Sequence, residues 1–301
     1  MIRKIYFLLL LACSVPNLMA QPSQTRHQSI KAEDYPGANV VVVFDSTVAD
    51  VQETGLTFVE MHRLYKVLTP AGALQMSVVK IDYDPLSAYV EIRKVVVHRG
   101  RGEEGKKGSG EEENGGSYEV VSPVLDYPAP ARAIYWGARE KMIEVGRLEP
   151  GDAVEVWLFR KGFTYALLGD PDDDSRYIPP MRGHFYDIIP FYSSDPIIEK
   201  VYQVAIPSDK MVQYEFYHGE VRSSVVPRDD KMVYTFVKKD IKPLKREPNM
   251  VDFSDVAPKL LISTSPDWYA KSVWFYGVNE DYGSFESTPA IDAKVAEILQ
   301  N

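Results

Sequence analysis

Runs of β-branched and aromatic residues recur along most of the chain, and they constrain the fold more than any other feature. Residues 40–44 form an unbroken apolar run, typical of a strand that is buried on both faces. Val212, Tyr214 and Phe216 alternate with polar residues, which is the period of a strand with one buried face. Similar runs cover residues 56–68, 78–83, 89–97, 118–121, 154–158, 201–206 and 232–237. Because turn residues separate these runs, the sequence predicts a mainly β protein, an antiparallel β-sandwich.

Helix signals are few and come late in the chain. Ser265 followed by Pro266 is typical of a helix start. Residues 69–72 (Thr-Pro-Ala-Gly), much earlier in the chain, are interpreted as a turn. A second helix is predicted from Thr288, with an apolar stripe formed by Ile291, Val295, Ile298 and Leu299. Such a stripe needs a surface to pack on. We expect one or two short C-terminal helices, the last belonging to a following domain; the alternative is that it folds back on the sandwich.

The first twenty residues have the pattern of an export signal. Arg3 and Lys4 precede an apolar run over residues 5–12, and Ala20 offers a small residue for cleavage. This run is much shorter than a membrane-spanning helix, which needs about 20 apolar residues, and we expect no transmembrane segment elsewhere. Residues 10–13 also resemble a lipobox, in which Cys13 would carry a lipid. We favour cleavage after Ala20 and expect an exported protein of the periplasm or cell envelope.

Cys13 is the only cysteine, so cleavage would leave a mature chain with neither a disulfide nor a thiol nucleophile. Stability must then come from a hydrophobic core, which a chain of this length can build. The formal net charge is −9, and loss of Arg3 and Lys4 makes it more negative. Nucleic acid is therefore not an expected partner, because its binding depends on neutralising phosphates with cationic side chains.

Composition also suggests domain boundaries. We expect a signal peptide over residues 1–20, a flexible segment over 21–38 and the sandwich domain over 39–276. Residues 100–117 contain only glycine and polar or charged residues, which predicts a mobile insertion, with a functional lid as the alternative. Residues 277–301 are interpreted as a linker and the start of a helix of the next domain.

Two groups of residues are candidates for binding. The aromatic residues Tyr135, Trp136, Trp268, Trp274 and Tyr276 could form a ligand platform for sugars, or could seal the core or an interface. The carboxylates Asp170, Asp172, Asp173 and Asp174 could supply oxygen ligands to calcium, although the EF-hand order is missing and a solvated acidic loop is the alternative. No other cofactor is expected. The five histidines are scattered without a metal-binding spacing, so we expect none to be catalytic.

Four stretches together resemble a known family. They are residues 65–72 (Y-K-V-L-T-P-A-G), 148–156 (L-E-P-G-D-A-V-E-V), 185–207 with its S-D-P and I-P elements, and 256–268 (V-A-P-K-L-L-I-S-T-S-P-D-W). In order and spacing they are similar to the domain of unknown function that precedes transglutaminase-like domains in exported bacterial proteins. The resemblance covers residues 40–276. It implies an antiparallel sandwich followed by a papain-like Cys-His-Asp domain, whose first helix the segment from Thr288 resembles.

The function expected from the sequence is a non-catalytic accessory or interaction domain. It would position substrates for, or pack on, a transglutaminase-like domain or another protein partner. The first alternative is a carbohydrate-binding module of a bacterial envelope system, which would bind a glycan with exposed aromatic residues. The second is a hydrolase that uses a carboxylate pair. The resemblance carries no catalytic residue into this chain.

Overall fold

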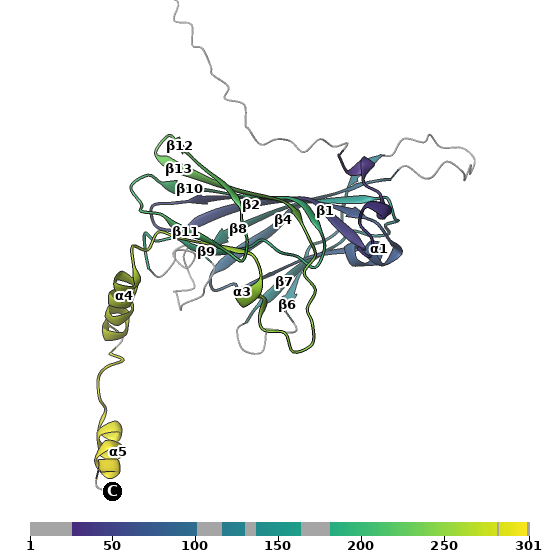
Figure 1. The fold of residues 1–301 in the computed structure, drawn as a ribbon. Coiled ribbons are helices and arrows are strands. Elements are labelled where there is room, and N and C mark those ends of the chain that lie inside the picture. The colour runs from purple at the N-terminus through teal and green to yellow at the C-terminus, as the bar shows by residue number, and fades with distance from the viewer. Residues whose placement is uncertain (1–25, 101–115, 130–136, 164–180, 282, 300–301) are drawn as a thin grey trace, which may run out of the picture.

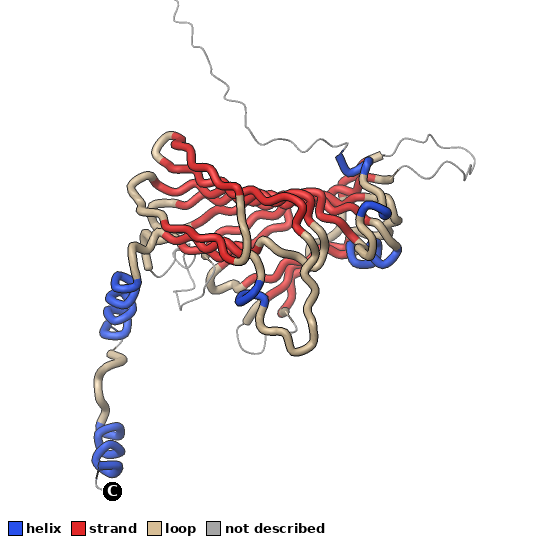
Figure 2. Tube along the Cα trace, viewed as in Figure 1, coloured by secondary structure: helices blue, strands red, loops and turns tan. Residues whose placement is uncertain are grey.

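The computed structural model describes residues 26–100, 116–129, 137–163, 181–281 and 283–299. The predicted signal peptide, most of the predicted insertion, Tyr135, Trp136 and the four candidate calcium ligands from Asp170 to Asp174 lie outside these residues. The described part is mainly β, as the sequence predicts, and its strands form one large and two small sheets (Figures 1 and 2).

The large sheet has eight strands. Their order is β12 (Arg222–Arg228), β13 (Lys231–Ile241), β10 (Ile197–Pro207), β1 (Val40–Val51), β2 (Thr57–Val67), β8 (Ala153–Gly162), β4 (Ala88–His98) and β5 (Ser117–Glu119). Every neighbouring pair is antiparallel except β1 and β10, which run parallel with Val42 opposite Ile197. The first five residues of β1 are buried, in agreement with the apolar run at its start.

Two three-stranded antiparallel sheets form the opposing layer (Figure 1). One contains β11 (Gln213–Tyr217), β14 (Lys259–Ser263) and β9 (Tyr186–Pro190); the other contains β3 (Val78–Tyr83), β7 (Arg139–Glu144) and β6 (Leu125–Pro128). Between the layers lie two main clusters of buried side chains. Phe191, Tyr202, Phe236 and Leu260 belong to the first cluster. Tyr65 packs against both clusters and so joins the two halves of the core.

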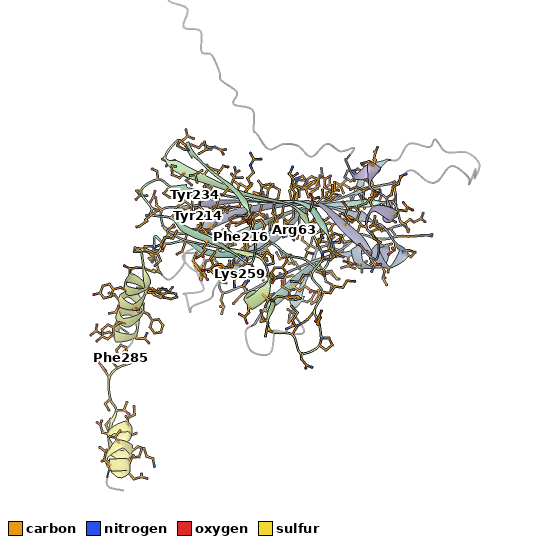
Figure 3. The ribbon with its side chains drawn as sticks, in the orientation of Figure 1. Arg63, Tyr214, Phe216, Tyr234, Lys259 and Phe285 are labelled. Atoms are coloured by element: carbon orange, nitrogen blue, oxygen red, sulfur yellow. The ribbon has the colours of Figure 1, made fainter. Side chains whose placement is uncertain are left out.

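Aromatic contacts hold the first small sheet on the large one. Tyr214 of β11 lies 5.1 Å from Phe236 and 6.1 Å from Tyr234 of β13, measured between ring centroids. Phe216, labelled in Figure 3 beside Tyr214, packs edge-on against Phe191, with 5.2 Å between ring centroids. The alternation of apolar residues in β11 therefore marks the side that faces the core.

The prediction of a turn at residues 69–72 was wrong, because these residues begin helix α1 (Pro70–Met76). Thr69 is the N-cap: its hydroxyl accepts a hydrogen bond from the backbone N–H of Gly72 at 3.1 Å. Pro70 occupies the first helical turn, where its missing N–H costs nothing. The same Thr-Pro pair suits either a turn or a helix start, and the buried Met76 shows that packing favours the helix.

The segment expected to be flexible, residues 21–38, contains two short 3₁₀ helices. They are η1 (Arg26–Ser29) and η2 (Ala32–Asp34), and they lie near the start of β1 (Figure 1). His27 is buried with 4% of its surface exposed, so this part of the segment packs on the large sheet.

Helices α4 (Trp268–Asp281) and α5 (Pro289–Leu299) project away from the sandwich (Figure 1), whereas the short helix α3 (Phe253–Val256) lies beside it. Asp267, not Ser265, caps α4, accepting a hydrogen bond from the N–H of Ala270 at 2.7 Å. The helix runs through the domain boundary that the sequence suggested after residue 276. None of the described helices combines the length and the apolar character that crossing a membrane requires.

Candidate functional site

A groove of about 720 Å³ lies between the outer face of the β11–β14–β9 sheet and helix α4. The sheet contributes Tyr186, Gln213, Glu215, Tyr217, Leu261 and Ser263, and the helix contributes Trp268, Lys271 and Trp274. This lining combines apolar and aromatic surface with a few polar groups, which is the usual composition of a binding groove.

Strand periodicity explains which side chains of the sheet reach the groove. In β14, Leu260 and Ile262 are buried against the large sheet, whereas Leu261 and Ser263 are only partly buried. Cross-strand pairing places Tyr186 and Gln213 on either side of Ser263. Neighbours across a sheet share a face, so these three side chains form one row on the outer surface.

Helix α4 presents Trp268, Lys271 and Trp274 at spacings of three residues, which places them on neighbouring turns of one side. The Lys271 ammonium lies 4.7 Å from the centre of the Trp274 ring, in cation–π contact. The Gln213 side-chain amide donates to the carbonyl of Ser265 at 3.0 Å. This bond ties β11 to the segment that leads into α4.

The carboxylates of the groove already have structural partners. Asp267 caps α4, and Glu215 accepts a hydrogen bond from the Tyr217 hydroxyl at 2.9 Å. Neither arrangement resembles an acid and base set on opposite sides of a substrate bond. The groove is therefore better suited to binding than to carboxylate-pair hydrolysis.

The surface of α4, α5 and their connection is apolar and exposed. Its large side chains with at least about half of their surface exposed are Trp268, Tyr269, Val273, Phe275, Tyr276, Phe285, Ile291, Val295, Ile298 and Leu299. The Tyr276 ring stacks on that of Phe285 at 5.0 Å, the main aromatic contact between α4 and the connection to α5. We call these ten residues the helical apolar surface.

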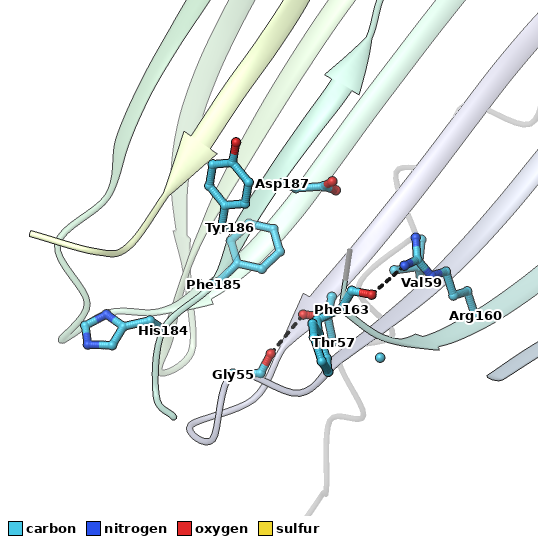
Figure 4. Close-up of a pocket in the computed structure, with 10 residues that line it drawn as sticks. Gly55, Thr57, Val59, Arg160, Phe163, His184, Phe185, Tyr186 and Asp187 are labelled. Atoms are coloured by element: carbon cyan, nitrogen blue, oxygen red, sulfur yellow. Dashed lines mark hydrogen bonds between the residues drawn. The ribbon is translucent and has the colours of Figure 1, made fainter. Parts of the chain in front are cut away.

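A much smaller pocket, of about 30 Å³, lies between β9 and the ends of β2 and β8 (Figure 4). The Arg160 guanidinium lines it and donates to the carbonyl of Phe163 at 2.7 Å; burial lowers the pKa of this arginine. Asp187, on the opposite wall, accepts a hydrogen bond from the buried Tyr202 hydroxyl at 3.1 Å. The volume fits about one water molecule, so this pocket is a small polar gap between strands and not a ligand site.

The outer face of the large sheet carries half-buried aromatic rings whose own faces are covered. The His62 ring stacks on Trp157 at 4.4 Å, and the Lys94 ammonium lies 5.3 Å from the same indole. The Arg93 guanidinium lies 4.1 Å from the Phe159 ring centre. Sugar binding needs free aromatic faces, so this row is packing between side chains and does not form a platform.

Sequence reasoning missed a cluster of ionisable groups on that outer face. Glu155 of β8 is hydrogen-bonded through one oxygen to His62 of β2, at 2.6 Å, and through the other to His98 of β4, at 2.7 Å. The other ring nitrogen of His98 meets the Ser117 hydroxyl at 2.7 Å. His27 packs beside His98 with 5.2 Å between ring centroids. Only strand pairing brings these residues together, because His62 and Glu155 are 93 positions apart.

Of the aromatic candidates from the sequence, Trp268 and Trp274 line the groove and Tyr276 belongs to the helical apolar surface. Tyr135 and Trp136 lie outside the described residues, as do the four candidate calcium ligands. Within the described part of the chain, no group of three or more histidine, cysteine or carboxylate side chains is arranged to hold a metal ion.

Comparison with known proteins places the chain in a family. A family model described as a domain of unknown function with a solved structure, DUF3857, matches residues 54–245, which is more than half of the chain. The chain belongs to the DUF3857 family. The match covers the large sheet from β2 to β13 and ends before the groove-lining helix α4. No curated protein matches.

One solved structure shares the fold of this chain. A putative protease from Parabacteroides distasonis superimposes with a TM-score of 0.57 at 14% identity, over 77% of this chain and 41% of that one. The chain thus spans about two-fifths of the length of that structure. An M1 zinc metallopeptidase from Deinococcus radiodurans matches 75% of this chain and 42% of its own, at 14% identity and a TM-score of 0.37. At such low identity the first likeness shows the fold alone, and the second is too distant to support an argument.

Proposed function

We propose that this DUF3857 domain is a non-catalytic accessory domain of an exported protein, which packs on a transglutaminase-like catalytic domain and helps to position its substrates. The observation that carries the proposal is the helical apolar surface. The two helices and their connection display ten large apolar side chains, and neither helix buries a residue. Exposed apolar surface of this kind marks a site of protein association.

The energetics of the two helices also favour a partner. Helix α5 has 11 residues, and an isolated helix of that length is marginal in water. Burying one side chain such as Leu299 or Phe275 stabilises an assembly by about 1.5–3 kcal/mol. A few such contacts would hold both helices against a neighbouring domain.

The assignment of catalysis to that neighbour follows from side-chain chemistry. The only thiol in the sequence is Cys13, which lies within the proposed signal peptide. A cysteine nucleophile of the papain-like kind must therefore come from another domain. The putative protease from Parabacteroides distasonis, of which this chain matches 41%, gives an example in which a similar fold is part of a longer protein.

A binding titration tests the proposal. The full chain is titrated with a transglutaminase-like domain from the same genome, alongside the double variant Tyr269→Ser/Phe275→Ser. If these side chains are central to the contact, the variant should bind at least about 30-fold more weakly, which corresponds to about 2 kcal/mol.

The matched control is Val225→Ser/Val226→Ser on the exposed edge strand β12, which belongs to the large sheet and not to the small sheet that lines the groove beside α4. It should bind like the wild type. Equal loss in both double variants, or no binding by any transglutaminase-like domain tested, would argue against the proposal.

A second candidate, glycan binding, is favoured by the aromatic groove. Tyr186, Tyr217, Trp268 and Trp274 line it together with polar Gln213 and Lys271, a combination that suits a sugar ring. Titration with cell-wall oligosaccharides separates the two functions: glycan binding that Trp274→Ala abolishes and Tyr269→Ser/Phe275→Ser preserves would favour the groove as the functional surface.

A further inference from the structure

Few of the N-terminal residues 26–34 are buried on the outer face of the large sheet. His27 is buried, and Ile30 packs against a small buried cluster that includes Phe44 and Leu64. Gln28 and residues 31–34 are exposed. Within the segment, the N–H of Lys31 donates to the Asp34 carboxylate at 3.0 Å, which closes a local turn. A segment with so few buried anchors opens more easily than the sheet beneath it.

The environment of His27 suits only its neutral form. Nδ1 of this ring is buried, and no described residue forms a hydrogen bond with it. The two oxygens of the nearest carboxylate, Glu155, are already hydrogen-bonded to His62 and His98. Protonation would therefore place a buried donor beside groups that offer it no acceptor, at a high energetic cost.

The charges that act on His27 come from three strands of the large sheet. Strand β2 contributes Lys66, β4 contributes His98, and β8 contributes Glu155, whose carboxylate also holds His62 of β2. The Lys66 ammonium donates to the carbonyl of Gly151 and is close enough to oppose a positive charge on His27. Glu155 favours that charge, but its influence on His27 is smaller than those of burial, His98 and Lys66.

We propose that residues 26–34 form a strap that leaves the outer face of the large sheet when His27 gains a proton. Release of the strap would uncover the cluster of His62, His98 and Glu155 together with the apolar patch around Phe44. In an exported protein, this device would link exposure of that face to the acidity of the surroundings.

The expected pH window follows from the titration of His27. Burial first, and then the nearby His98 and Lys66, lower the pKa of docked His27 from 6.5 to about 4. In the released strap His27 regains its ordinary pKa, so it binds the proton more tightly than it does in the docked strap. The docked strap is therefore most stable above pH 6.5 and loses stability as the pH falls toward 4. The equilibrium constant for docking should fall roughly 30-fold between pH 7.5 and pH 5.

Amide hydrogen exchange of the full chain tests the strap. After correction for intrinsic exchange rates, protection of the amides in residues 27–35 should fall roughly 30-fold from pH 7.5 to pH 5, provided that exchange follows opening of the strap. Amides in the centre of β1 should keep their protection. Protection of residues 27–35 that is unchanged between the two pH values would overturn the proposal by itself.

Three variants show whether His27 is the responsive group. His27→Phe keeps a ring that cannot be protonated, so its strap should stay protected at both pH values. Ile30→Ala should lower protection by a similar factor at pH 7.5 and pH 5. His218→Asn, at an exposed position with φ of 57° that Asn tolerates, should behave like the wild type. A pH dependence in His27→Phe equal to that of the wild type would assign the effect to another group and refute the strap mechanism.

Discussion

At the scale of single residues, the most demanding feature is a charged group inside the large sheet. The Asp45 carboxylate of β1 accepts a hydrogen bond from Arg63 of β2 at 2.9 Å and another from Lys200 of β10. Only 9% of the Asp45 and Lys200 side chains is exposed. Buried charges of this kind persist only as pairs, because each one alone would be costly to take from water.

Replacement of Asp45 by Asn should therefore destabilise the fold by about 3–5 kcal/mol, since two cations would lose their common counter-charge. Urea unfolding at pH 7 measures the loss. The control is Asp126→Asn, whose carboxylate pairs with Arg139 at 2.7 Å in a more exposed setting. This control should change stability by no more than about 1 kcal/mol, and an equal effect of the two variants would contradict the importance of burial.

The same carboxylate predicts part of the acid sensitivity. Burial alone would raise the pKa of Asp45, but Lys200 and Arg63 outweigh it and lower the pKa from 3.8 to about 2. A lowered carboxyl pKa stabilises the fold above pH 3.8, and this contribution disappears as the pH falls toward 2. Asp45 should account for about 2 kcal/mol of that loss. The free energy of unfolding, measured from pH 5 to pH 2, checks this contribution. It should fall less steeply with decreasing pH in Asp45→Asn than in the wild type.

At the scale of elements, helix α1 depends on one capping residue. The Thr69 hydroxyl accepts from the Gly72 N–H at 3.1 Å and donates to the Asn39 side-chain carbonyl at 2.8 Å. Gly72 itself packs closely on the backbone of Asn39: a Cβ added to Gly72 would lie 2.1 Å from the backbone carbonyl oxygen of Asn39. The cap thus fixes both the start of α1 and its contact with the entry to β1.

Thr69→Ala should lower the free energy of unfolding by about 1 kcal/mol, because the cap is lost. Thr69→Ser keeps the hydroxyl and should lose much less. Thermal unfolding of the two variants measures the difference. If both variants lost the same stability, the methyl group of Thr69 and not its hydroxyl would be the stabilising part.

The strands divide into those that the sequence predicts and those that it does not. Strands such as β8 and β10, with buried residues at alternate positions, have the period that the sequence analysis recognised. All seven residues of β12 are exposed, and β7 is rich in charged residues, so neither has an apolar pattern. These elements are strands because a neighbouring strand offers hydrogen bonds to their backbone, which local sequence does not record.

At the scale of the whole molecule, stability should be uneven. Strands β1 and β10 lie in the interior of the large sheet and contribute many buried side chains, whereas α4 and α5 bury none. Secondary structure without buried contacts opens locally at little cost. The chain therefore combines a rigid sandwich with helices that are poised to pack on something else.

Hydrogen exchange should show this contrast directly. Amides of β1 and β10 should exchange only on global unfolding, whereas those of α5 should exchange within seconds at neutral pH because its 11 residues form a marginal helix. Adding the partner domain proposed above should slow exchange in α4 and α5 while leaving β1 unchanged. Slow exchange in α5 of the isolated chain would contradict the view that its surface is unpartnered.

The sequence by itself determined the β class, the central strands and the position of the C-terminal helices. Those features depend on periodic burial and capping, which neighbouring residues specify. Only the tertiary structure decided that β1 pairs in parallel with β10, that Glu155 gathers two histidines, and that α4 faces the outer side of a small sheet. The physical reason is distance along the chain: the two histidines lie 57 and 93 positions from Glu155, and β1 and β10 are further apart still, so the geometry exists only after the strands have paired.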